Sequence, residues 1–119
     1  MFKIILDYFV PVFLLVPSYF ILMSYKKASI ADKIEDKVGV QFKTAKKSLE
    51  IYNEVNKKTY ITYFVIYVIQ VAVVIAENIL KLYSKHFLGE DLLTFIIISY
   101  LLSILISYGI TIMVSKKYE

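Results

Sequence analysis

The sequence predicts an all-α integral membrane protein with three transmembrane helices and an amphipathic-helix insert between the first and the second. Three observations predict this fold class: 59% of the 119 residues are hydrophobic, the mean hydropathy is +0.66, and charge concentrates in one stretch. A soluble domain of this length could not hide so much apolar surface in a compact core. We expect one membrane domain over residues 1–119, with spans at about 5–25, 59–83 and 91–115 and an insert at 26–58.

The first span is predicted from the apolar stretch between Asp7 and Lys26. Residues 8–25 carry no charge, and their length lies within the roughly 17–25 residues that cross a hydrocarbon core of about 30 Å. Pro11 and Pro17 interrupt the stretch, and proline in a membrane helix leaves a carbonyl unbonded and tends to kink the helix. Because lysines follow the apolar run and no small-residue cleavage site precedes them, we expect an uncleaved anchor rather than a signal peptide.

The insert is lysine-rich and is expected to form two short amphipathic helices. Apolar residues recur four apart over residues 30–38, which predicts a first helix that ends at Gly39. Thr44 can cap a second helix, which we expect to continue into the second span without a break. Both helices should lie at the lipid interface, with their lysines toward anionic headgroups.

Two further uncharged runs predict the second and third spans. The first run covers residues 59–76, and its apolar character extends to Tyr83. The second run covers residues 92–115 and is the longest and clearest span. Because the connection between them is short, these two spans should form an antiparallel hairpin.

The distribution of lysine predicts the orientation of the spans. Most lysines lie in the insert and at the C-terminus, and the opposite side holds Lys3, Lys81 and Lys85. The positive-inside rule then places the insert and the C-terminus in the cytoplasm and the N-terminus outside. A lysine-, isoleucine- and tyrosine-rich composition without Arg, Cys or Trp suggests an AT-rich bacterial gene, so the expected location is the bacterial inner (plasma) membrane.

Several chemistries lack the residues that they need. The chain has no Cys, and its single His has no nucleophile–base arrangement or second ligand near it in sequence, so we expect no enzyme, no cofactor and no metal site. The absence of Arg argues against nucleic acid as a partner, since bidentate Arg contacts carry much of base recognition. Three spans without an internal repeat also fall short of a self-contained transporter.

Polar residues form a stripe along each half of the predicted hairpin. In the second span they alternate at steps of three and four, which keeps them on one helix face: Tyr60, Tyr63, Tyr67, Gln70, Val74 and Glu77. In the third span, small hydroxyl residues recur at every fourth position: Ser99, Ser103, Ser107, Thr111 and Ser115. We favour a helix-packing seam, and a groove for a ligand or ion and a homo-oligomer interface remain open.

A second candidate site lies in the membrane and at its outer face. It comprises Asp7, Tyr63, Tyr67, Gln70, Glu77, Asn78, Glu90 and Asp91. An acid within a span is a functional candidate, although Glu77 lies near the outer end of its helix and can reach the interface. The acidic residues would then form a rim that is either solvated or able to receive a cationic peptide from outside.

A motif in the insert points to a family. Its matching positions are Gly39, Lys47, Ser48, Glu50, Tyr52 and Asn56. This motif resembles the cytoplasmic signature of the SdpI/YhfL family of small bacterial membrane proteins, which runs roughly Gly-Tyr-Arg-Thr, a short gap, Lys-Ser-x-Glu-x-Trp and then Ala-Asn. The arrangement of one span before the motif and a hairpin after it also agrees. Gln41 stands where the family has Arg, Phe42 where it has Thr, and Tyr52 where it has Trp.

The resemblance implies a non-enzymatic immunity protein that protects a bacterium against a secreted membrane-active toxin, such as a bacteriocin. If the family's Arg is essential, Gln41 implies an altered activity. From the residues themselves, Gly39 would permit a turn, Tyr52 would anchor the insert at the headgroups, and Asn56 would bond the end of a neighbouring span. Two alternatives stay open, namely a small accessory subunit of a larger membrane complex and a holin-like pore former.

Overall fold

The computed structural model of the chain describes residues 2–34, 38–40, 42–85 and 91–118. The described part is helical, with no strands, and contains α1 (Phe2–Phe13), α2 (Leu15–Ser29), the short 3₁₀ helix η1 (Lys43–Lys46), α3 (Leu49–Leu82) and α4 (Leu92–Lys117). Three segments are long and apolar enough to cross a membrane: Phe2–Ser29, Leu49–Leu82 and Leu92–Lys117. The prediction of three such helices is confirmed.

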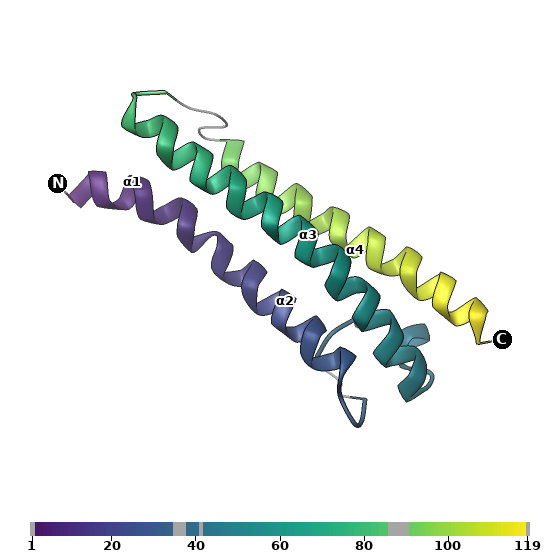
Figure 1. The fold of residues 1–119 in the computed structure, drawn as a ribbon. Helices are drawn as coiled ribbons and strands as arrows, with labels where there is room; N and C mark the ends of the chain where they lie inside the picture. The colour runs from purple at the N-terminus through teal and green to yellow at the C-terminus, as the bar shows by residue number, and fades with distance from the viewer. Residues whose placement is uncertain (1, 35–37, 41, 86–90, 119) are drawn as a thin grey trace.

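The helices form an elongated bundle in which α3 packs against both α2 and α4 (Figure 1). Its longest dimension is 57 Å. The insert and the C-terminus lie at one end, here called the insert end, and the N-terminus lies at the other, here called the distal end (Figure 1). The antiparallel hairpin expected from the short connection is therefore present.

The first apolar segment is divided by Leu14, between two prolines. Pro17 lacks an N–H group, so the α-helical hydrogen bond to the carbonyl four residues earlier cannot form. The chain keeps a helical path through this point, since the Leu14 N–H donates to the carbonyl of Val10 at 3.1 Å. Leu14, the single residue between α1 and α2, thus separates the two helices without ending the segment.

The first amphipathic helix predicted for the insert is wrong in the described residues. Helix α2 continues to Ser29, and residues 30–34 and 38–40 are not helical, while 35–37 lie outside the described residues. Backbone groups of residues 38–40 bond to side chains of α2 and α3 instead of to a helical ladder. Tertiary hydrogen bonds have replaced the helix that the four-residue apolar spacing favoured.

The second insert helix begins later than predicted. Ser48, not Thr44, caps α3, because Ser48 has an extended backbone and its hydroxyl accepts from the Ile51 N–H at 3.2 Å. Thr44 lies within η1. From Leu49 onward, α3 runs without interruption through the second predicted span, which confirms the continuity expected there.

Two apolar clusters hold the helices together. The larger cluster lies toward the insert end and includes Leu22 and Tyr25 of α2 with Val55 and Tyr63 of α3. The smaller one lies toward the distal end, where Val74 packs with residues of α4. Outward faces of all four α-helices carry large exposed apolar side chains, as expected for helices that face lipid.

Candidate functional site

The motif positions Tyr52 and Asn56 meet the insert backbone at the insert end. Their spacing of four places them on one face of α3, and both side chains are 0% exposed. The Tyr52 hydroxyl donates to the Val38 carbonyl at 2.7 Å. The Asn56 amide accepts from the Val40 N–H at 2.8 Å and donates to the Tyr52 carbonyl at 2.7 Å. Two side chains of α3 thereby fix the backbone on both sides of residue 39.

Gly39 fits against this pair because it has no side chain. Its φ is +78°, and a Cβ there would lie 2.3 Å from Asn56 Oδ1 and 2.6 Å from the Ala28 Cβ. Its N–H donates to the Ser24 hydroxyl of α2 at 2.7 Å. We call this set of residues (Ser24, Ala28, Val38, Gly39, Val40, Tyr52 and Asn56) the insert clamp. The insert clamp joins the insert to α2 and α3 at once.

The rest of the insert extends these contacts to α4. The Phe42 ring meets the Tyr108 ring edge-to-face, with centroids 5.3 Å apart. Lys117 Nζ donates to Glu54 Oε1 at 2.7 Å, which holds the end of α4 against the start of α3. This hydrogen bond lowers the pKa of Glu54 and raises the pKa of Lys117. Through these contacts the insert end joins all three apolar segments.

The remaining motif positions lie outside the insert clamp. Ser48 caps α3, whereas Lys47 and Glu50 are exposed, and Gln41 lies outside the described residues. The expectation that Tyr52 anchors the insert at lipid headgroups is wrong, because its ring is buried and its hydroxyl bonds the backbone. The Asn56 amide bonds the insert and its own helix, not the end of a neighbouring span.

The polar stripe of α3 divides between two neighbours. Tyr63 is buried against Tyr25 of α2, with ring centroids 5.7 Å apart, and Tyr67 lies 6.5 Å from the ring of Tyr19. Further along, Gln70 Nε2 donates to the Ser99 hydroxyl of α4 at 2.6 Å. Tyr63 and Tyr67 therefore face the first apolar segment, whereas Gln70, further along the stripe, is bonded to α4.

Four small hydroxyl residues of α4 bond their own helix, and three of them, Ser103, Ser107 and Thr111, are buried while Ser99 is partly buried. The hydroxyls of Ser99, Ser103 and Ser107 donate to carbonyls three residues back, and that of Thr111 to the carbonyl four residues back. Their own helix satisfies these donors, and their small size lets α4 approach α3 closely. This arrangement suits the packing-seam interpretation of the stripe.

Glu77 does not belong to a solvated rim, contrary to the expectation from its place near a helix end. It is 1% exposed, since it continues the buried face that carries Gln70 and Val74. Asp7 and Asp91 are exposed at the distal end, and Glu90 lies outside the described residues. A buried acid in a membrane helix is a functional candidate, because burying an ionisable group is energetically costly.

A contact between α3 and α1 at the distal end was missed by sequence reasoning. Pro11 has no N–H group, so the carbonyl of Asp7 has no partner within its helix. Lys81 Nζ donates to that carbonyl and lies 5.8 Å from the centroid of the Tyr8 ring. Asn78 Nδ2 donates to the Tyr8 carbonyl at 3.2 Å. The position of Pro11 shows that the Asp7 carbonyl lacks a helical partner, but nothing in the sequence identified Lys81 as the donor to it.

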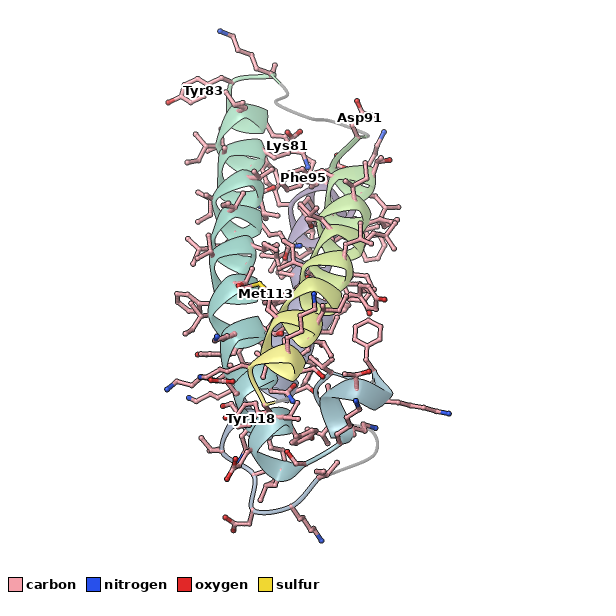
Figure 2. The ribbon with its side chains drawn as sticks, turned by 90° about the vertical axis from the view of Figure 1, so that its right-hand side faces the viewer. Lys81, Tyr83, Asp91, Phe95, Met113 and Tyr118 are labelled. Carbon is pink, nitrogen blue, oxygen red and sulfur yellow. The ribbon has the colours of Figure 1, made fainter. Side chains whose placement is uncertain are left out.

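Figure 2 shows how differently the labelled side chains of the distal end are placed. Lys81 reaches from α3 into the space between the helices, whereas Tyr83 points away from the bundle (Figure 2). Within the described ranges, no three His, Cys, Asp or Glu side chains are grouped as a metal site.

The fold and the sites define a class: an all-helical chain with three helices able to cross a membrane, which suggests a multi-pass membrane protein. No family model, curated protein or solved structure matches the chain. The function is therefore argued from the residues and their geometry.

Proposed function

We propose that the protein is an SdpI-like immunity protein that protects a bacterium against a secreted membrane-active toxin by binding or blocking it. The observation that carries this proposal is the insert clamp. Three positions of the family-like motif, Gly39, Tyr52 and Asn56, meet in one buried contact although the first lies outside α3. The contact supports the proposal, because it gives three separate positions of the motif one shared structural role.

The proposed orientation follows the positive-inside rule. The insert end, which carries the insert lysines together with Lys116 and Lys117, would lie in the cytoplasm of a bacterial plasma membrane. The distal end would then face outside and present the exposed carboxylates of Asp7 and Asp91. These groups favour a cationic toxin, and the clamp would hold the helices in the arrangement that presents them.

The test is protection of a toxin-sensitive strain that expresses the protein. We expect survival against a toxin encoded beside the gene, and loss of protection in Asn56→Ala, which leaves the Val40 N–H without its acceptor. Glu50→Gln is the matched control, since it lies in the same motif but is exposed. Protein in the membrane fraction is measured for each variant, and unchanged killing by every neighbouring toxin would remove the proposal.

The two alternatives give different outcomes in the same strain. A holin-like pore former would kill the host when it is induced, even without toxin. An accessory subunit would be recovered from mild detergent with another membrane protein. If induced cells stay healthy, the pore-former alternative is excluded. If the protein purifies alone, the accessory-subunit alternative is excluded, and the immunity function remains.

A further inference from the structure

Three recesses follow one another along the bundle between the first apolar segment and its neighbours. At the distal end, a recess of about 390 Å³ is lined by Asp7 and Lys81. A second recess, of about 290 Å³, shares both of these residues. A third, of about 390 Å³, shares Leu14 and Leu93 with the second. We call the three together the lateral groove, because each recess has two lining residues in common with the next.

The polarity of the lateral groove changes along its length. Its first recess has Tyr8 and Ser84 beside the two charged residues. Its third recess is walled mainly by apolar side chains of α1, α2 and α4, including Pro17 and Ile96. A polar beginning and an apolar continuation match the shape of an amphiphile with a charged head and a hydrocarbon chain.

The length of the lateral groove suits one leaflet of a bilayer. Along the first apolar segment it extends from Asp7 to Ile21, which is about 21 Å at 1.5 Å per residue. Half of a hydrocarbon core of about 30 Å is shorter than this distance. The lining residues of the three recesses therefore cover a distance at least as long as the depth of one leaflet.

The two charged groups at the polar end are not paired with each other. Lys81 Nζ donates to the backbone carbonyl of Asp7, and its ammonium group has further donors to offer. The Asp7 carboxylate is exposed and makes no hydrogen bond or ion pair with any described residue. A single anion would satisfy the lysine but be repelled by the carboxylate, whereas a ligand with an anion and an ammonium group would suit both.

We propose that the lateral groove binds one zwitterionic phospholipid with an ethanolamine headgroup. Its phosphate lies at Lys81, and its primary ammonium group donates to the carboxylate of Asp7. One acyl chain follows the apolar recesses between Leu14 and Leu93 toward Ile96. The segment between Pro11 and Pro17 forms one wall.

The experiment is a lipid titration of the purified full chain in detergent, followed by native mass spectrometry. The probes are phosphatidylethanolamine and phosphatidylglycerol with identical acyl chains. We expect one tightly held phosphatidylethanolamine, bound about tenfold more tightly than phosphatidylglycerol, since a charged hydrogen bond differs between them. Asp7→Asn should remove most of this preference, because it removes the acceptor of the ammonium group. Lys81→Gln should instead weaken the binding of both lipids, because both carry the phosphate. The matched controls Lys85→Gln and Asp91→Asn change exposed charges outside the groove lining and should keep both the binding and the preference.

A second variant keeps the test decisive if Lys81→Gln loosens α1. Leu93→Trp fills the groove where two recesses join, so it should abolish binding of both lipids, while Leu101→Trp on an exposed face of α4 should not. Circular dichroism checks the helical content of each variant. Equal retention of the two lipids, no retained lipid, or a second copy of the chain that displaces lipid would each overturn the proposal.

Discussion

Gly39 has a positive φ, and it lies where any side chain would meet Asn56 and Ala28. Both facts come from one contact, because the backbone turns in order to present the neighbouring Val40 N–H to Asn56. A residue that looks like a simple turn in the sequence is thus a position where two helices and the insert come into contact. Replacing it tests the insert clamp more directly than replacing a charged residue of the motif.

We expect Gly39→Ala to destabilise the protein by about 2–5 kcal/mol. A left-handed backbone costs a non-glycine residue roughly 1–2 kcal/mol, and overpacking adds roughly 1–3 kcal/mol. The free energy of unfolding in mixed detergent measures the effect. Gly109→Ala is the matched control, because nothing lies within 4 Å of a Cβ there. Since glycine weakens a helix interior, this control should be neutral or stabilising by up to about 1 kcal/mol. Equal losses in both variants would contradict the proposed fit of Gly39.

Helix α3 begins at a residue that the capping rule alone does not select. Ser48 and Thr44 are both good caps, and both precede residues compatible with a helix. The difference is made by η1, whose 3₁₀ turn buries Ala45 and leaves the chain extended at Ser48. The 34-residue α3 thus begins after Ser48, and Thr44, the other possible cap, lies within η1.

Ser48→Ala should destabilise the protein by about 1 kcal/mol, as the loss of an N-cap typically does. The affected site is the Ile51 N–H, which loses its side-chain acceptor. Hydrogen exchange at that amide and the free energy of unfolding measure the change. Thr44→Ala removes a hydroxyl that does not cap α3, so it should have a smaller effect on both. A larger effect from Thr44→Ala would place the cap where the sequence first suggested.

The positions of the long helices and the buried face of α3 could be predicted, because apolar runs and residue spacing are local properties of the sequence. The long helices follow from uncharged runs, and the spacing of Tyr63, Gln70 and Glu77 identified a face of α3 that is buried. Spacing does not say which neighbour covers that face. Tyr63 meets α2 and Gln70 meets α4, because α3 lies between them.

The insert could not be predicted in the same way because its conformation depends on distant partners. Tyr52 and Asn56 supply hydrogen bonds to backbone groups about fifteen residues earlier, and these bonds compete with the local helix that the apolar spacing favours. The burial of Glu77, by contrast, agrees with its place on the same face of α3 as Gln70, and the expectation of a solvated rim was wrong because it used only the depth of Glu77 along the helix.

At the scale of the whole molecule, the contact between Lys117 and Glu54 predicts a pH dependence at the end of α4. The pKa of Glu54 is lowered, so its contribution is present above the unfolded-state value, about 4.3, and is lost as the pH falls through the folded-state pKa. The pKa of Lys117 is raised, so its contribution is lost only when the pH rises above about 10.4.

We therefore expect hydrogen-exchange protection in the last turn of α4 to be greater at pH 7 than at pH 3. The effect should be small, since Lys117 is 62% exposed and solvent screens the pair. Glu54→Gln should remove the pH dependence in this turn, whereas Glu50→Gln, on the exposed side of the same helix start, should retain it. The same pH dependence in Glu54→Gln would show that another carboxylate is responsible.

The overall arrangement also predicts which segments share a side of the membrane. Contacts at the insert end hold the insert against the end of α4, so both must lie on one side, and Ser84 beyond the end of α3 must lie on the other. The absence of cysteine makes single-cysteine labelling unambiguous. A membrane-impermeant maleimide should label Ser84→Cys in intact cells, and Asp32→Cys only after permeabilisation. Labelling of both cysteines in intact cells would contradict the fold. The reverse pattern would agree with the fold but reverse the orientation. The surface proposed to meet a toxin would then face the cytoplasm.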